Sequence, residues 1–411
     1  MTADSRSALT PDRLLSGVRI FDLTHFLAGP YCTMLLADLG AEVVKVERPA
    51  TGDPARVRGP FGLSEKGEPI ATGFLGPNRN KASLTLNLKA PEARTIMTRL
   101  LPHFDAVIEN MSAGTLDRLG FGYDFIRSVN PRAVLVSISG YGQPGTSPYA
   151  DLPAFGPIAE ALSGFTARTG GRSGKPMFTG IPLADTLTGA YAAFATLAAL
   201  TGARSNGLGC HVDVSQYDCL VSQMERLLLF WETQGLEVPP GSERNWLPTG
   251  VVEALDGYVM YAAVSEEYFR ELARLVGAED VLTDTRLQTP HDREEYLTDL
   301  FSPRVERWAN ERTRSEIVET LRSAGIPVAP INGVRDVYED DNLWARSMFI
   351  EIDHETEGRA SYVGNPVKVN GVMRAREESA PPLGRDTEAI LREVVGASEP
   401  EISAWRQSGA I

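Results

Sequence analysis

The stretch VRIFDLTHFLAGPYCTMLLADLGAEVVKVE, residues 18–47, decides the fold. Residues 18–23 form a short apolar run typical of a strand, and 41–47 form a second one. Between them, 29–40 has helical character, opens with Gly-Pro and closes at Gly40, the expected start and stop residues of a helix. The stretch therefore predicts a βαβ unit, which implies parallel strands joined by a right-handed crossover.

The alternation continues along the chain. We expect further strands at 81–88, 105–111, 132–142 and 209–215, and helices at 91–104, 186–200 and 216–235. This pattern is typical of an α/β fold with an open, Rossmann-like parallel sheet covered by helices on both faces.

A chain of 411 residues is long enough for two or three lobes. A segment rich in Pro and Gly, 237–250, marks a boundary, and a smaller α/β lobe follows it. We expect a large lobe at 1–225, a small lobe with its preceding linker at 226–330, and a C-terminal segment at 331–411 that returns to the large lobe.

The charge and the cysteines restrict the function classes. Forty basic against 54 acidic residues give a formal charge of −14, which argues against nucleic acid or an anionic membrane as the main partner. The three cysteines form no CxxC pair and the five histidines form no HxxH or HExxH pair, so neither a disulfide scaffold nor a zinc site is indicated. With a polar N-terminus and no apolar segment of membrane-spanning length, we expect a soluble cytoplasmic protein without a bound metal.

Three common catalytic motifs are absent: GxGxxG after the first strand, GxxxxGK[ST], and GxSxG. What remains is Asp185, which follows an apolar turn and precedes a long apolar helix. Helix-terminal N–H groups favour an ionised carboxylate there, and such a carboxylate can attack an activated acyl carbon. The alternative role is a plain helix N-cap.

Blocks spread over most of the chain resemble one family. They are LSGVRIFDLTHFLAGPYCTMLLADLGAEVVKVERP, NRNKASLTLNL, ENMSAGTLDRLGFGYD, LVSISGYGQ, ADTLTG, AGIPVAPINGV, ARSMF and APPLGRDTEAIL. In this order they resemble the class III CoA-transferase family, which also contains acyl-CoA racemases. The resemblance implies an interlocked homodimer in which each chain loops through its partner.

The resemblance also implies roles for individual residues. Asp185 falls where the family has its acyl-accepting aspartate. The positions expected to line the coenzyme A groove are Phe26, Leu27, Arg48, Asn80, Lys81, Asn110, Met111 and Arg118. The three basic residues suit phosphate contacts, with a solvated surface charge as the alternative for each. For the two asparagines, turn or cap roles are equally open.

The implied reaction moves coenzyme A from an acyl-CoA to a small carboxylic acid through an aspartyl anhydride and an aspartyl-CoA thioester. Coenzyme A is then a substrate, and no permanently bound cofactor is expected. Succinyl-CoA with another short dicarboxylate is one candidate pair, and Arg56 or Arg58 could bind a distal carboxylate.

The sequence departs from the family at several positions. A racemase needs two bases, but the matching positions hold Phe155 and Ser265 (Glu266 is adjacent), which disfavours proton transfer at the α-carbon. Formate- and oxalate-type members of the family carry a run of glycines. The matching region of this sequence is NWLPTG (245–250), in which only Gly250 is a glycine. Gly156 replaces a family glutamate, and Glu160 stands where a glutamine is common. A nonenzymatic acyl-CoA binding protein and a nicotinamide-dependent oxidoreductase remain alternatives from other classes.

Overall fold

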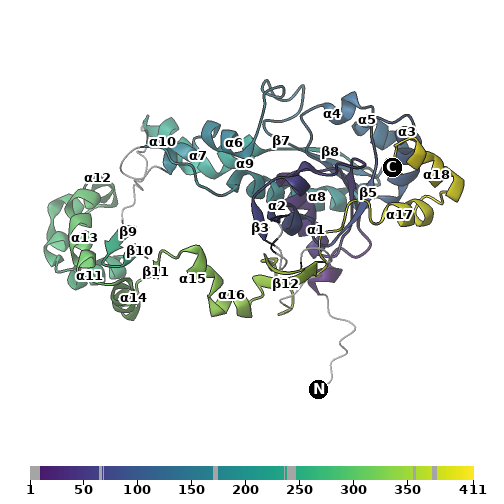
Figure 1. The fold of residues 1–411 in the computed structure, drawn as a ribbon. Helices are drawn as coiled ribbons and strands as arrows, with labels where there is room; N and C mark the ends of the chain where they lie inside the picture. The colour runs from purple at the N-terminus through teal and green to yellow at the C-terminus, as the bar shows by residue number, and fades with distance from the viewer. Residues whose placement is uncertain are drawn as a thin grey trace, which may run out of the picture. The chain divides into compact units, whose positions relative to one another are not determined.

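The computed structural model describes residues 10–63, 67, 69–169, 175–235, 237, 247–354, 358–372 and 377–411. The chain forms two compact units (Figure 1). Unit 1 comprises Met1–Gly235 and Asn342–Ile411, and unit 2 comprises Leu236–Asp341.

A six-stranded parallel sheet forms the centre of unit 1. Its strands lie side by side in the order β5-β2-β1-β6-β7-β8. Their bounds are β1 Arg19–Asp22, β2 Glu42–Glu47, β5 Lys81–Thr85, β6 Ala106–Glu109, β7 Val134–Ser139 and β8 His211–Ser215. Numbered by their place in the chain, the order is 3-2-1-4-5-6, the doubly wound Rossmann arrangement. The prediction of an open parallel α/β sheet is confirmed.

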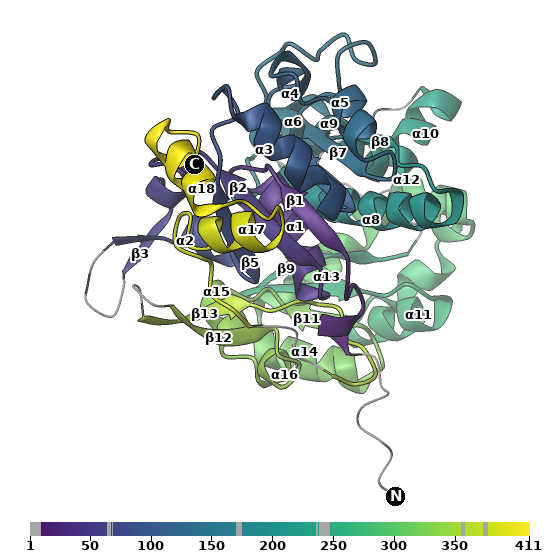
Figure 2. The ribbon, with the colours of Figure 1, turned by 90° about the vertical axis from the view of Figure 1, so that its right-hand side faces the viewer.

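Helices cover both faces of this sheet because successive strand side chains point to opposite sides. Ile20 belongs to the apolar cluster under α1 (Ala28–Asp38) and α8 (Leu183–Asn206). Its neighbour Phe21 belongs to the cluster under α3 (Ala93–Leu100) and α5 (Tyr123–Val129). On that second face, α17 (Thr387–Glu393) and α18 (Glu399–Gln407) also lie beside α3 (Figure 2).

Helix α8 is longer than its sequence pattern indicates. By length and composition it could span a membrane, which the shorter expected helix could not. In the structure it packs closely on α1: a Cβ added at Gly189 would lie 2.6 Å from the carbonyl oxygen of Ala28. Glycine is needed where two backbones approach this closely. Packing in the core of unit 1 accounts for part of the apolar composition of α8, whereas Tyr191 and Phe194 on the same helix are exposed.

The end of the chain closes the edge of the main sheet. Asp386 accepts a hydrogen bond from the backbone N–H of Ser83, and Thr387 Oγ1 accepts one from Thr85. Both acceptors lie next to β5, so residues separated by about three hundred positions share one edge.

The other α-helices of unit 1 are α2 Thr72–Leu75, α4 Thr115–Arg118, α6 Gly156–Leu162, α7 Phe165–Arg168, α9 Gln216–Val221, α10 Glu225–Gln234 and α16 Asp341–Ala345. Two antiparallel strand pairs complete it: β3 Phe61–Leu63 pairs with β4 Pro69–Ala71, and β12 Phe349–His354 pairs with β13 Gly358–Val363.

Unit 2 has an antiparallel sheet in the order β11-β10-β9. Its elements are β9 Thr249–Ala254, β10 Gly257–Ala262, α11 Glu266–Leu275, α12 Pro290–Leu300, α13 Ser302–Asn310, α14 Arg314–Ser323, β11 Val328–Pro330 and α15 Val334–Tyr338. The rings of Phe269 and Phe301 meet edge to face at 5.2 Å in its apolar core. The unit begins later in the chain than the expected boundary at 226, because α10 belongs with unit 1.

Candidate active site

A cavity of about 1110 Å³ lies at the carboxyl ends of the parallel strands of unit 1. The residues that directly follow these strands line it: Leu23 after β1, Arg48 after β2, Leu86 after β5, Asn110 after β6, Gly140 after β7 and Gln216 after β8. Ligands of doubly wound folds bind at this edge, where the strand order reverses. The topology alone therefore makes this cavity the candidate site.

The structure brings most of the expected site residues to this cavity. Its lining includes Phe26, Leu27, Arg48, Asn110, Met111, Arg118 and Asp185. These side chains come from separate strand ends and from the first turns of α4 and α8, so the fold gathers residues that are far apart in the sequence.

Asn80 and Lys81 do not line this cavity, and the structure gives them other surroundings. Lys81 is the first residue of β5, whereas the cavity lies beyond the other end of that strand. Its fully buried ammonium group pairs with Asp22 Oδ2 at 3.0 Å and donates to Asn78 Oδ1 at 2.9 Å. Asn80 has a left-handed backbone (φ 63°) and donates to Asp38 Oδ1 at 2.7 Å. Both are buried residues that hold the loop before β5.

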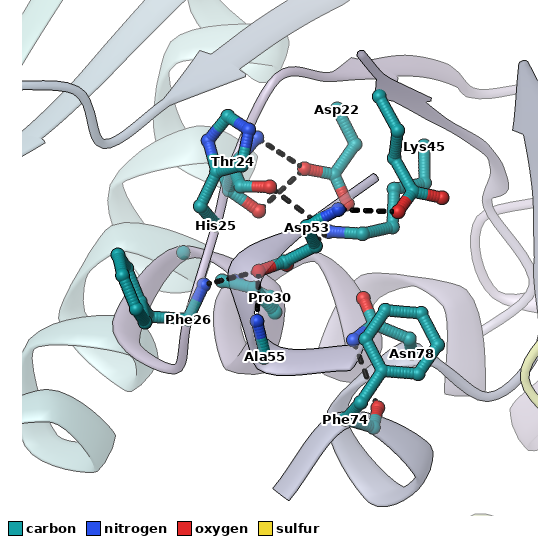
Figure 3. A network of polar contacts seen from close by, with 12 residues as sticks. Asp22, Thr24, His25, Phe26, Pro30, Lys45, Asp53, Ala55, Phe74 and Asn78 are labelled. Atoms are coloured by element: carbon teal, nitrogen blue, oxygen red, sulfur yellow. Dashed lines mark hydrogen bonds and ion pairs between the residues drawn. The ribbon is translucent and has the colours of Figure 1, made fainter. Parts of the chain in front are cut away.

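A second buried ion pair, between Lys45 and Asp53, lies next to the loop that carries Phe26 (Figure 3). Lys45 Nζ lies 3.0 Å from Asp53 Oδ2, and neither side chain has any exposed surface. Asp53 Oδ1 accepts hydrogen bonds from the backbone N–H groups of Phe26 and Ala55. Phe26 has φ 63°, a backbone conformation that non-glycine residues rarely adopt. The ion pair therefore stabilises the strained residue that presents its ring to the cavity.

Asn110, which directly follows the neighbouring strand β6, fixes the same loop. Its Oδ1 accepts from the backbone N–H of His25 at 2.7 Å, and its Nδ2 donates to the carbonyl oxygen of His25 at 2.8 Å. Both ends of the amide are thus occupied within the protein. Asn110 lines the cavity, but these bonds assign its side chain to positioning the loop that carries Phe26.

Asp185 is the third residue of α8 and does not cap the helix. The N-cap position is Pro182, and the backbone N–H of Ala184 donates to the buried side chain of Glu160 at 3.3 Å. The plain N-cap role that the sequence left open is therefore not the one Asp185 has. Instead, Asp185 Oδ1 accepts a hydrogen bond of 2.8 Å from Gln216 Nε2.

Burial raises the pKa of Asp185 from 3.8 to about 6. The hydrogen bond from Gln216 opposes this shift, and the nearby carboxylate of Glu160 adds to it. Asp185 is consequently ionised for the most part at pH 7, but it is more basic than an exposed carboxylate. A basic carboxylate with little hydration is a better nucleophile than a fully solvated one.

Four cationic side chains line the cavity: Arg48, Arg58, Lys89 and Arg118. Two of them, Arg58 and Lys89, were not among the expected groove residues. Arg58 lies over the ring of Phe26, 5.5 Å from its centroid. Arg56 is engaged elsewhere, because it forms two hydrogen bonds to Glu47, at 2.7 and 2.8 Å. The cavity is therefore suited to a polyanionic ligand even though the chain is acidic overall.

Gln216 is the residue that sequence reasoning missed. It directly follows β8 and opens α9, and its signal was only that position at a strand end. Across the described ranges, His, Cys, Asp and Glu side chains form no group of three that could hold a metal ion.

The fold and the site define an α/β enzyme with an ionised, partly buried carboxylate beside a cationic cavity. The sequence model of CoA-transferase family III matches residues 15–387, and the chain belongs to this family. It is a class III CoA-transferase, as the resemblance in the sequence predicted.

Relatives match over nearly the full length. A formyl-CoA:oxalate CoA-transferase of Afipia carboxidovorans is 32% identical, with 97% of this chain and 98% of the relative covered. An acyl-CoA transferase of Fusarium pseudograminearum is 33% identical over 99% of this chain and 90% of the relative. The crystal structure of a CaiB/BaiF family protein from Brucella suis has a TM-score of 0.78 at 30% identity, covering 92% of this chain and 99% of that one.

Proposed function

We propose that this enzyme transfers coenzyme A from an acyl-CoA to a carboxylic acid, with Asp185 as the nucleophile. The observation that carries the proposal is that the ionised Asp185 shares one cavity with four cationic side chains. A carboxylate that is basic, partly buried and next to a polyanion site suits attack on a thioester whose carrier is phosphorylated.

The proposed reaction has two halves. Asp185 Oδ2 attacks the thioester carbon of the donor, the C–S bond breaks, and an aspartyl anhydride and coenzyme A thiolate form. The thiolate then attacks Asp185 Cγ, the bond from Cγ to Oδ2 breaks, and the donor acid leaves as a carboxylate. The product of this half is an aspartyl-CoA thioester.

In the second half the acceptor carboxylate attacks Asp185 Cγ and displaces the thiolate. The thiolate then attacks the acyl carbon of the acceptor, which forms the new acyl-CoA and restores the Asp185 carboxylate. Each step exchanges one activated acyl group for another, so no nucleotide is consumed.

The cavity lining supports a position for coenzyme A. Arg48, Arg58, Lys89 and Arg118 are the candidates for its phosphates, because guanidinium and ammonium groups bind phosphate oxygens strongly. Phe26, Leu27 and Met111 supply apolar surface for the adenine or the pantetheine arm.

For the acyl groups we propose short carboxylates, with succinyl-CoA as a candidate donor. The relatives named formyl-CoA:oxalate CoA-transferase make formyl-CoA with oxalate the second pair to test. Incubating the enzyme with succinyl-CoA, acetyl-CoA or formyl-CoA and a panel of free acids, followed by mass spectrometry of new thioesters, distinguishes them. New thioesters formed only from long-chain or branched acids would contradict the proposal.

The racemase of the same family is the rival activity. Phe155 lines the cavity and cannot transfer a proton, and Ser265 in unit 2 caps α11 by accepting from the backbone N–H of Tyr268. We therefore expect no exchange of the substrate α-proton with deuterated water. Rapid exchange measured by NMR would favour the racemase.

We also propose that the chain forms an interlocked homodimer. The support is a set of exposed apolar side chains on α6, α8 and α10, which water-exposed surfaces normally avoid: Ile158, Leu162, Tyr191, Phe194, Leu228, Leu229 and Trp231. Sedimentation at micromolar concentration should show a dimer. Mixed labelled and unlabelled dimers should not exchange subunits without unfolding, and rapid exchange would exclude interlocking.

The decisive experiment is Asp185→Ala. Transfer should be lost while coenzyme A still binds in calorimetry, because the cationic residues are untouched. In the native enzyme, acyl-CoA followed by hydroxylamine should leave a hydroxamate on Asp185, detected by peptide mass spectrometry. Undiminished turnover in the variant would exclude Asp185 as the nucleophile.

A further inference from the structure

Gln216 donates a hydrogen bond to one of the two carboxylate oxygens of Asp185, and the other oxygen has a different neighbour. Gln216 is buried, lines the cavity, and donates from Nε2 to Asp185 Oδ1 at 2.8 Å. Because the acceptor is a carboxylate oxygen, the atom facing it must be the amide nitrogen. Asp185 Oδ2 lies on the other side, next to Gly156. The two oxygens are therefore in different environments before any substrate arrives.

We propose that Gln216 is a catalytic residue that stabilises negative charge on Asp185 Oδ1 whenever the carboxyl carbon of Asp185 is attacked. The inference rests on the proposed function, in which this carbon is attacked twice per cycle. In this proposal the hydrogen-bond donor acts on the activated acyl group that Asp185 itself forms, rather than on the acyl group of the substrate.

This role of Gln216 follows from which oxygen atom becomes negatively charged in each step. When thiolate attacks Cγ of the anhydride, the C–S bond forms and the carbonyl electron pair moves to Oδ1. The pair then returns, the bond between Cγ and Oδ2 breaks, and the donor acid leaves. Attack of the acceptor on the thioester places charge on the same Oδ1. In both cases the Gln216 N–H already faces the oxygen that becomes the oxyanion, which is the geometry such stabilisation requires.

The first step of the cycle places its charge elsewhere. Attack of Asp185 on the donor thioester develops charge on the carbonyl oxygen of the donor, which Gln216 does not face in this arrangement. Removing the amide should therefore slow formation of the aspartyl-CoA thioester without weakening the binding of acyl-CoA.

The first test is Gln216→Met, which keeps an unbranched side chain of similar length and removes the donor. We expect kcat to fall by about 10²–10³-fold, the usual effect of losing one oxyanion donor, with KM for the acyl-CoA within about threefold. Thioester formation, followed by quenching and mass spectrometry, should slow by the same factor. Gln407→Met, at an exposed position on α18, is the matched control and should change neither quantity. A kcat within threefold of the native enzyme, or a loss confined to KM, would overturn the inference.

The second test uses the native enzyme and does not depend on a folded variant. The acid with the highest turnover in the panel is labelled with ¹⁸O in its carboxylate and cycled many times in unlabelled water. Each cycle leaves one acceptor oxygen on Asp185, at the position of Oδ2, while Gln216 keeps Oδ1 in place. The peptide that contains Asp185 should therefore gain one labelled oxygen and no more. Labelling of both oxygens would overturn the inference, whereas no label on Asp185 would overturn the proposed function itself.

Discussion

A Cβ added to Gly156 would lie 2.7 Å from Oδ2 of Asp185 and 3.3 Å from its Cγ. Gly156 is the first residue of α6, and the preceding Phe155 packs edge to face on Phe26 with ring centroids 6.3 Å apart. Only glycine leaves room for the carboxylate in its observed position. Gly156, where the sequence resemblance predicts a family glutamate, thus lies against the proposed nucleophile.

We predict that Gly156→Ala lowers kcat by at least tenfold through displacement of the Asp185 carboxylate. A small misplacement of a reacting group is sufficient for such a loss. The measurement is the steady-state rate of transfer together with coenzyme A affinity, which should be unchanged.

The matched control is Gly202→Ala in the same helix as Asp185. A Cβ at Gly202 would meet nothing within 4 Å, so activity should be native and the helix should gain about 0.5–1 kcal/mol of stability. Equal activity in both variants would show that Gly156 does not position the nucleophile.

The pH dependence of kcat/KM, which reports the ionisation of the free enzyme, should show an acid limb near pH 6. Burial raises the pKa of Asp185 to about 6, and only the ionised form is a nucleophile. Below that pH the rate should fall about tenfold per pH unit. An acid limb near 4 in a pH–rate profile would contradict this assignment.

Glu160→Gln should move that acid limb to lower pH. Glu160 is buried, and its charge disfavours the ionised form of Asp185. An amide keeps the acceptor for Ala184 and removes the charge, so the pKa of Asp185 should fall. The pH–rate profiles of both enzymes, measured side by side, give the shift, and an acid limb at higher pH would contradict the role of Glu160.

Asp185→Asn should stabilise the folded protein at neutral pH while abolishing transfer. The folded state raises the pKa of Asp185 above that of the unfolded chain, so protonation favours folding and stability declines as pH rises from about 4 to 6. Removing the charge should restore on the order of 1–2 kcal/mol above pH 6, less than full linkage because the carboxylate faces the cavity. Thermal melting at fixed protein concentration, at pH 4 and pH 7.5, should show the gain only at the higher pH.

Substitution by methionine should affect protein stability at Lys81 and coenzyme A binding at Lys89. Lys81→Met leaves the buried Asp22 without its closest cation and should destabilise the protein by about 3–5 kcal/mol. Lys89→Met alters an exposed cavity residue, so it should weaken coenzyme A binding while stability changes by less than about 0.5 kcal/mol. Denaturant melts and calorimetry measure the two quantities. Weakened coenzyme A binding without destabilisation in the Lys81 variant would show that Lys81 contacts coenzyme A after all.

The sequence by itself determined the parallel α/β sheet, because strand and helix periodicities and their glycine and proline boundaries are local properties. It also pointed to Asp185 as a carboxylate at a helix start, whereas Arg48 and Arg118 were expected only from the resemblance to a known family. The resemblance to the class III CoA-transferases supplied the chemistry.

Only the tertiary structure decided what each side chain faces. Lys81 and Arg48 are both basic residues at the ends of strands. Lys81 is buried in an ion pair with Asp22, whereas Arg48 lines the cavity. The bond from Gln216 to Asp185 joins residues 31 positions apart. It exists because α8 returns the chain to β8, so that the residue after β8 meets the first turn of α8. Such contacts depend on the packing of whole elements, which no local pattern of residues encodes.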